Sequence, residues 1–378
     1  MSSAIDNKAQ DNLSIKDEGL EILPEGVPPL TALYLYIAGS CNLACRHCWI
    51  TPNYIPNGKA GNFLRLEHVQ KAVKEATPLG LNHVKLTGGE PTLHPQFREL
   101  VNIVDQAGAN ISMETNGTLI DSSLAAFLKD TRNFNFVSVS LDGADAATHE
   151  SLRLVPGCFD EAVQGIRNLV AVGLAPQIIC SLHQGNRDQI GAMVKLANDL
   201  GCQSLKFNHI QSNGRGKEMV KTEGISVQEL IGIYNYIETE LSLSSKIPIH
   251  FDIPLAFHSK KTLLREQGSQ CNVLNIIGLL SGGDVSLCGI GVTVPELIYG
   301  NIAKDSMSEI WCHSAGLKKL RQIIPGGLQG ICDKCIHKEF CLGACVAANY
   351  SASGALETPY YFCVEAEQSN LFPTSRMR

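Results

Sequence analysis

Short apolar runs and amphipathic stretches alternate along the chain from Thr31 onward. The apolar runs have the length of buried strands, and the stretches between them carry apolar residues three or four positions apart, as amphipathic helices do. The predicted strands are Leu33–Ala38, His83–Thr87, Asn110–Glu114, Asn135–Leu141, Gln177–Leu182 and Ser204–His209. The predicted helices between them are Leu66–Thr77, Gln96–Ala107, Ser122–Lys129, Phe159–Val172 and Gln189–Leu200.

Repeated strand–helix units predict a parallel sheet with right-handed crossovers, built either as an open barrel or as a doubly wound sheet. Chemically reactive side chains follow many of these strands, and a barrel gathers the carboxyl ends of all its strands around one site. We therefore expect an α/β chain whose main part is a partial (βα)6 TIM-like barrel.

The alternation stops after Ile253, where cysteines and glycines become frequent. Two short strands, Asp284–Leu287 and Leu297–Tyr299, and one helix, Ser306–Ile323, are predicted here. So short a segment buries little core and usually needs metal or disulfide crosslinks. We expect a flexible lead-in (1–29), a barrel (30–253), and a linker with a small cysteine-rich domain (254–378).

Composition excludes several classes of protein. With a net charge of −6 and only short basic pieces, the chain offers no surface for nucleic acid. No signal peptide and no apolar run of roughly 20 residues is present, so we expect a cytoplasmic protein without membrane contact. Fourteen cysteines in a reducing compartment indicate metal ligands rather than disulfides.

Three cysteines, Cys41, Cys45 and Cys48, directly follow the first predicted strand. Three thiolates on one loop can bind a four-iron cluster and leave one iron open, as a catalytic metal requires. A zinc site whose fourth ligand lies elsewhere, or three unrelated thiols, is the alternative.

The C-x3-C-x2-C loop resembles the radical S-adenosylmethionine superfamily, and the resemblance extends from Leu33 to about Lys217. His47 stands where that family usually has an aromatic residue. The resemblance implies a [4Fe–4S] cluster on Cys41, Cys45 and Cys48, with S-adenosylmethionine as cosubstrate.

The resemblance continues at later strand ends, where it implies contacts to the methionyl ammonium group, the ribose hydroxyls and the carboxylate. Outside that context, Gly-Gly-Glu-Pro is an ordinary turn and Arg153 an ordinary surface ion pair. The segment Asn213–Gly216 resembles a motif of members with an extra cysteine domain, or is a flexible basic loop. The implied cosubstrate-binding residues are Gly88, Gly89, Glu90, Glu114, Ser140 and Arg153.

Seven cysteines near the C-terminus have the spacing of the SPASM domain, which they resemble; a pair of zinc ribbons is the alternative. The resemblance implies two auxiliary iron–sulfur clusters. The outer set is Cys332, Cys335, Cys341 and Cys363, and the inner set is Cys271, Cys288 and Cys345. Because Leu264–Gln270 contains no cysteine, we expect an open or non-cysteine fourth position at the inner cluster. Cys312 is interpreted as buried packing.

The other reactive side chains give weaker signals. Cys158, Cys180 and Cys202 have no partner close in sequence and are interpreted as structural thiols. His83, His94, His183 and His209 are scattered, and two of them lie near strand ends.

The resemblance implies reductive cleavage of S-adenosylmethionine to a 5′-deoxyadenosyl radical that acts on a ribosomally made peptide. Sulfatase-maturing relatives carry an aspartate where Gly289 stands. The segment Cys45–Pro52 resembles cyanobacterial peptide maturases, among them the spliceases, which excise a tyrosine-derived fragment. Carbon–carbon or thioether crosslinking and maturation of a small-molecule cofactor are the alternatives, and the general acid or base stays unassigned.

The expected partners follow from the same resemblance. The lead-in is too short for the winged-helix leader-binding domain of many maturases, so we expect a separate leader-binding protein besides the precursor peptide. We also expect an electron donor such as flavodoxin or ferredoxin.

Overall fold

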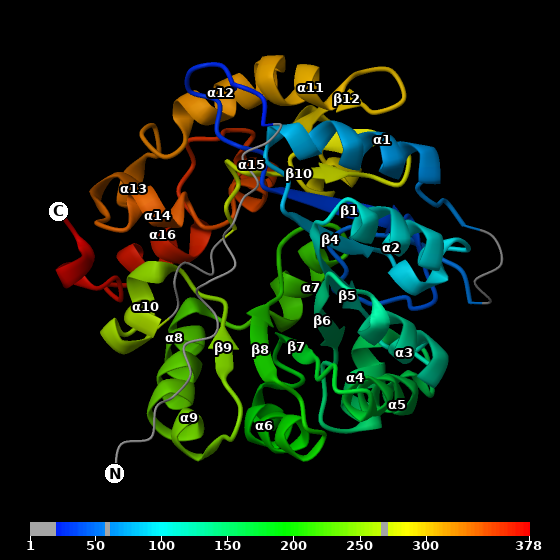
Figure 1. Cartoon of the computed structure of the whole chain (residues 1–378). Helices are drawn as coiled ribbons and strands as arrows, with labels where there is room; N and C mark the ends of the chain where they lie inside the picture. The colour runs from blue at the N-terminus through cyan, green and yellow to red at the C-terminus, as the bar shows by residue number, and fades with distance from the viewer. Residues whose placement is uncertain (1–19, 57–60, 266–270) are drawn as a thin grey trace, which may run out of the picture.

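The computed structural model describes residues 20–56, 61–265 and 271–378. At its centre, six parallel strands stand side by side in the order in which they occur along the chain (Figure 1). A doubly wound sheet reverses its strand order, so this order confirms the barrel-like alternative. The six strands are β1 (Ala32–Ala38), β4 (His83–Gly88), β5 (Asn110–Thr115), β6 (Phe134–Ser140), β7 (Gln177–Leu182) and β8 (Ser204–His209).

The strands are buried on both faces, which explains their nearly continuous apolar sequence. In β4, for example, Val84 and Leu86 are fully buried in the core, whereas Lys85 and Thr87 point the other way and line an internal cavity. All five helices predicted between the strands are present, with ends within one residue of the prediction. They are α1 (Leu66–Ala76), α2 (Phe97–Gln106), α3 (Ser122–Asp130), α5 (Cys158–Ala171) and α6 (Ile190–Asp199).

The sheet continues beyond both edges of the six strands. On one side β9 (Ile249–Phe251) pairs in parallel with β8, and on the other β10 (Ile276–Leu279) pairs in parallel with β1. Two antiparallel strands, β11 (Asp284–Ser286) and β12 (Ile298–Asn301), follow β10. One sheet thus joins the two predicted domains, whose boundaries stay a prediction.

The predicted helix Ser306–Ile323 is wrong in one respect, because it is two helices, α11 (Met307–His313) and α12 (Ala315–Ile323). Ser314 separates them with an extended ψ of 128°, and its N–H donates to the Ile310 carbonyl at 3.2 Å. Serine favours helix ends because its hydroxyl competes for backbone hydrogen bonds.

Part of the predicted lead-in packs against the body of the protein. The Glu21 N–H donates to the Pro78 carbonyl at 2.8 Å, and the indole N–H of buried Trp311 donates to the Pro28 carbonyl at 2.8 Å. Residues 1–19 of this segment lie outside the described residues.

Short helices complete the C-terminal part (Figure 1). Among the described residues, no helix has the length and apolar character needed to cross a membrane. The last helices are α13 (Gly330–Lys334), α14 (Lys338–Cys341), α15 (Val346–Ser353) and α16 (Tyr361–Gln368).

Candidate active site

A cavity of about 530 Å³ lies at the carboxyl ends of the barrel strands, where it meets the C-terminal part of the chain. Thiols from both ends of the sequence line it, together with five of the six predicted cosubstrate-binding residues, all except Glu90. The thiols that line this cavity are Cys41, Cys45, Cys48, Cys271, Cys288 and Cys345.

Backbone contacts to β4 position the loop that carries the first three cysteines. Gly89 packs so tightly on this loop that a Cβ there would lie 2.0 Å from the Ser40 carbonyl oxygen. Gly88 has a φ of +126°, which favours glycine. Asn116 adds a hydrogen bond to Asn42 at 2.8 Å and lies 3.9 Å from the Cys41 sulfur.

Glu90 is fully buried and does not line the cavity. Its carboxylate accepts hydrogen bonds from the hydroxyl groups of Thr92 and Thr115, at 2.6 and 2.7 Å, and from the N–H of Asn116 at 2.8 Å. In this structure the side chain therefore ties the end of β4 to the end of β5, and its direct contact to the cosubstrate stays a prediction.

Arg153 is held by a buried ion pair with Asp142. Its Nε and Nη2 both lie 2.6 Å from Asp142 Oδ2, and its Nη1 lies 3.6 Å from the Cys45 sulfur. Burial alone would raise the pKa of Asp142, but the guanidinium brings it to about 2. The pair therefore stays charged and places a cation beside the first thiol set.

A second charged pair, Lys85 and Glu114, faces the cavity from β4 and β5. Lys85 Nζ lies 2.8 Å from Glu114 Oε1 and 4.4 Å from the centre of the Tyr34 ring. Burial disfavours both charges, but each charge stabilises the other. As a result, the pKa of Lys85 is raised and the pKa of Glu114 is lowered.

Sequence reasoning missed several polar groups of this cavity, among them Lys85, Lys206, Asp252 and Tyr360, whereas His209, one of the scattered histidines, does line it. The His209 ring nitrogen and the Tyr360 hydroxyl lie 2.9 Å apart, which joins β8 to the C-terminal part. The signal for the two lysines was available: each interrupts an apolar strand at a position that alternation turns to the inside of a barrel.

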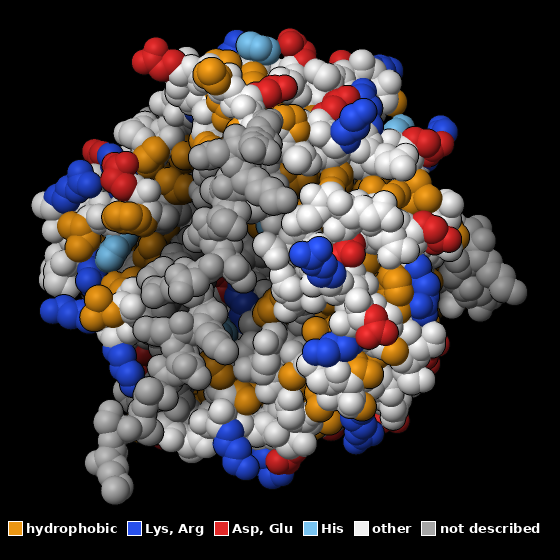
Figure 2. Space-filling model, viewed as in Figure 1, with side chains coloured by type: hydrophobic (Ala, Val, Ile, Leu, Met, Phe, Trp, Pro, Cys, Tyr) orange, Lys and Arg blue, Asp and Glu red, His pale blue; other side chains and the backbone are white. Residues whose placement is uncertain are grey.

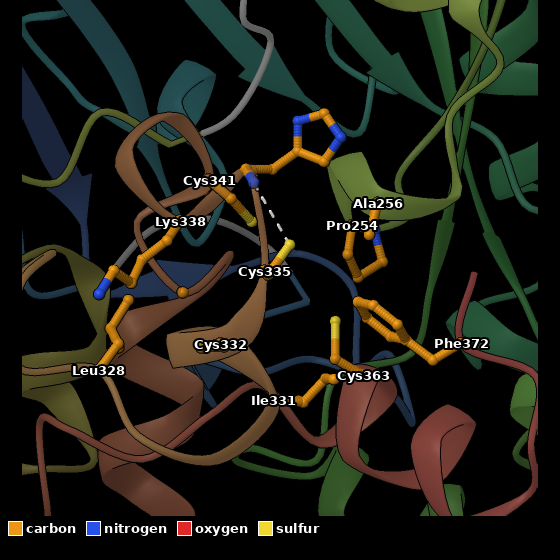
Figure 3. Close-up of a pocket in the computed structure, with 12 residues that line it drawn as sticks. Pro254, Ala256, Leu328, Ile331, Cys332, Cys335, Lys338, Cys341, Cys363 and Phe372 are labelled. Carbon is orange, nitrogen blue, oxygen red and sulfur yellow. Dashed lines mark hydrogen bonds between the residues drawn. The ribbon is translucent and has the colours of Figure 1, made fainter. Parts of the chain in front are cut away.

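The outer thiols line a separate small cavity of about 20 Å³ (Figure 3). Figure 3 shows the sulfur atoms of Cys335, Cys341 and Cys363 directed into the same space, and Cys332 also lines it. In the described part of the chain, no three Cys, His, Asp or Glu side chains are arranged to hold a single metal ion.

Burial raises the pKa of thiols from each of the three sets, to about 12 for Cys41 and Cys271 and to about 11 for Cys341. Buried thiols of this kind become thiolates only when a metal replaces their protons. The chemistry of three groups of thiols, each lining a common cavity, fits iron–sulfur clusters, and the individual ligand sets stay a prediction.

The other cysteines do not line either cavity. Cys158, Cys180, Cys202 and Cys312 are all buried, as expected of structural thiols. The stretch 266–270, where a further inner-cluster cysteine was sought, lies outside the described residues. Of the histidines, His83 and His94 bond to Ser112 and the Leu64 carbonyl, and His209 faces the cavity.

Both halves of the chain match known protein families. Residues 35–197 match the radical SAM superfamily, and residues 271–336 match SPASM, described as an iron–sulfur cluster-binding domain. The AdoMet-dependent heme synthase of Methanosarcina barkeri is 27% identical over 338 residues, which cover 86% of this chain and 94% of that protein. Mycofactocin maturase MftC of Mycobacterium tuberculosis is 26% identical over 351 residues, which cover 92% of this chain and 86% of MftC.

Among solved structures, Streptococcus suis SuiB bound to its precursor peptide SuiA has a similar fold. The TM-score is 0.71 at 17% identity, and the match covers 89% of this chain and 76% of SuiB.

Proposed function

Because this chain is a radical S-adenosylmethionine enzyme with a C-terminal SPASM domain, we propose that it modifies a ribosomally made precursor peptide. Its cofactors are a [4Fe–4S] cluster, auxiliary iron–sulfur clusters and S-adenosylmethionine. The observation that carries the proposal is that one thiol set from each half of the chain lines a single cavity. A substrate in that cavity contacts both halves. MftC, a relative of this chain, is named a maturase. SuiB, a protein of similar fold, is bound to a precursor peptide in its solved structure.

When bound, the first cluster and S-adenosylmethionine supply a carbon radical that abstracts hydrogen from the substrate. In our proposal Cys41, Cys45 and Cys48 hold the first cluster. Gly88 and Gly89 let the backbone approach the methionyl end, and Ser140 binds the ribose.

The rest of the cavity wall orients the peptide and excludes water. Trp49, Ile50 and Tyr36 pack together beside Cys48 and give the cavity an apolar side. Asp252 and Lys206 face the same space from the β8–β9 side. These two groups are our candidates for moving a proton at the substrate, because each is ionisable and lines the cavity.

We further propose ligand sets for the auxiliary clusters. Cys332, Cys335, Cys341 and Cys363 hold the outer one, and Cys271, Cys288 and Cys345 hold three positions of the inner one, whose fourth position is open. Support comes from the two cavities, each lined by one complete set.

Among peptide reactions, we propose excision of a tyrosine-derived fragment, supported by the likeness of Cys45–Pro52 to the spliceases; crosslinking is the alternative. Gly289 disfavours a role in sulfatase maturation, because sulfatase-maturing relatives carry an aspartate at this position. A Cβ at this position would lie 2.3 Å from the Tyr36 ring, so an aspartate side chain has no room there.

The experiment is anaerobic incubation of the reconstituted enzyme with S-adenosylmethionine, dithionite, a candidate precursor peptide and the proposed leader-binding protein, followed by mass spectrometry. Loss of a tyrosine-derived fragment supports excision, and loss of paired hydrogens supports crosslinking. An unchanged peptide in this complete mixture refutes the proposal.

A second candidate function rests on the heme synthase relative, which matches at a similar identity to MftC. In this reading the enzyme acts on a small-molecule cofactor. A parallel incubation with an iron porphyrin in place of the peptide separates the two, since only one of the substrates should be consumed.

We also propose two protein partners in the cytoplasm, where free thiols persist: a leader-binding protein and a flavodoxin or ferredoxin. Ile336 and Phe340, beside the outer thiols, are 40% and 77% exposed and offer an apolar contact to a reductant. Figure 2 shows hydrophobic, basic and histidine side chains gathered where Figure 1 places α13 and α14. Tight binding of the full precursor by this chain alone would count against the leader-binding partner.

A further inference from the structure

The loop between β8 and α7 (Gly216–Glu223) carries a cation that the proposed function does not use. Arg215 lines the large cavity, and its Nε and Nη2 are buried without a hydrogen-bond partner. A guanidinium remains charged at all physiological pH values. The Arg215 side chain is partly buried, but two buried N–H groups without an acceptor are unfavourable, so this arrangement indicates that a ligand supplies one.

The loop is built into the site. Gly214, at a φ of +54°, lies so close to the backbone after the third cysteine that a Cβ would sit 2.5 Å from the Trp49 oxygen. The Arg215 N–H donates to the Cys48 carbonyl at 3.0 Å. The segment Asn213–Gly216 is therefore fixed against the cluster-binding loop rather than being a free basic loop.

Neighbouring charges do not neutralise Arg215. Within the part of the chain that the structure describes, it forms no ion pair, and Glu223 of the following helix is paired with Arg46 and lies 3.5 Å from His183. Arg153, which the family resemblance assigns to the cosubstrate carboxylate, is already occupied by Asp142. Arg215 is thus the guanidinium that remains available.

Two further unpaired atoms accompany it. The side-chain oxygens of Gln211 and Asn213 are buried, have no hydrogen-bond partner and belong to residues that line the same cavity. Amide oxygens accept from N–H donors. A ligand that matches this loop carries a carboxylate for the guanidinium and an N–H group beside it.

We propose that Arg215 binds a ligand carboxylate in the active-site cavity, with Gln211 and Asn213 accepting from the adjacent N–H group. Two sources present this chemistry: the methionyl end of S-adenosylmethionine, and an acidic residue or C-terminus of the peptide. The first source rests on the enzyme family alone, and the second rests on the proposed function.

The test compares Arg215→Gln with Lys217→Gln, which removes the same charge from an exposed position two residues away. Dissociation constants are measured anaerobically by calorimetry on the reconstituted full chain, for S-adenosylmethionine and for the precursor peptide. Each ligand is paired with a carboxylate-free form: the methyl ester of S-adenosylmethionine, and an amidated peptide with Asn and Gln for Asp and Glu. Arg215→Lys, which keeps the charge but not the paired donors, covers the case that Arg215→Gln does not fold.

We expect Arg215→Gln to weaken binding of one carboxylate ligand by about 10- to 100-fold, with little effect on its carboxylate-free form. Lys217→Gln should bind both ligands as tightly as the wild type does. Arg215→Lys should lose less affinity than Arg215→Gln. The ligand affected identifies the source.

Unchanged binding of both ligands overturns the proposal, as does an equal loss of affinity for the carboxylate-free forms. A shifted electron-resonance signal of the reduced cluster with unchanged binding also overturns it, since the guanidinium would then serve the cluster. The peptide measurement is made with the proposed leader-binding protein present. If the wild type then fails to bind the peptide, the proposed function fails, and the cosubstrate measurement still decides the role of Arg215.

Discussion

Replacing Gly89 with alanine is expected to empty the first cluster site while the rest of the chain stays folded. The new Cβ would lie 2.0 Å from the Ser40 oxygen, where ordinary contacts begin at 3.4 Å. One of the two backbones must therefore move by about 1.4 Å, and Ser40 directly precedes Cys41. The Glu90 N–H, which donates to the same oxygen at 3.0 Å, is disturbed as well.

The cost can be worked from these contacts. Overpacking of this kind costs about 1–3 kcal/mol, and a disturbed backbone hydrogen bond adds about 1 kcal/mol. At tenfold per 1.4 kcal/mol, a total of about 2–4 kcal/mol lowers the population of the native loop by about 30- to 700-fold. Because the displaced loop carries Cys41, the smaller population of the native loop weakens binding of the first cluster.

The assay is iron and sulfide per chain after anaerobic reconstitution, with a melting curve to establish that the protein is folded. A variant in which Cys41, Cys45 and Cys48 are all replaced by alanine gives the iron and sulfide content of the auxiliary clusters alone. The iron content of Gly89→Ala should approach that value. Gly191→Ala in α6 is the matched control, because its Cβ meets nothing within 4 Å; it should keep full iron and gain up to about 1 kcal/mol in stability. Full iron content and an unchanged electron-resonance signal in Gly89→Ala would refute the reasoning.

Two further predictions concern buried side chains outside the cavities. Burial lowers the pKa of His149 from 6.5 to about 4, so below pH 6.5 the unfolded chain takes up a proton that the folded chain does not. The free energy of unfolding should therefore fall by about 2 kcal/mol from this residue between pH 6.5 and 5. Urea unfolding at several pH values should show a shallower fall in His149→Gln, and an identical fall would contradict the assignment. Cys312→Ala should keep all its iron, because Cys312 lies in the apolar core of α11 and lines neither cavity; loss of the inner cluster would make it a ligand and refute the open fourth position.

The strands and helices of the barrel could be predicted because their signal is local. Gln177–Leu182 and Ser204–His209 are apolar runs bounded by turns, and the structure has the same ends. The thiol sets were equally accessible, since their spacing in sequence is the feature that the chemistry requires. The break at Ser314 was missed because apolar periodicity continues through it, and a backbone change at one residue leaves no mark on that pattern.

The polar half of the cavity was beyond sequence reasoning for a different reason. Lys85 and Glu114 lie on the neighbouring strands β4 and β5, and Asp252 follows β9, which pairs with the strand that carries Lys206; only the pairing and curvature of the sheet bring these residues to one space. Arg153 shows the opposite limit. Arg153 lines the cavity, as the motif predicts, and its role there stays a prediction; its ion pair with Asp142 depends on side-chain geometry that spacing does not encode. Arg215 became a candidate only when its unpaired nitrogen atoms were seen.

Release of 5′-deoxyadenosine tests the central claim most directly. Reconstituted enzyme reduced with dithionite in the presence of S-adenosylmethionine should form it, as measured by liquid chromatography and mass spectrometry. Single alanine variants of Cys41, Cys45 and Cys48 should form none, whereas Cys202→Ala, which alters a buried thiol outside both cavities, should match the wild type. If the wild type forms no 5′-deoxyadenosine, or if a Cys41 variant forms as much as the wild type, the account is contradicted.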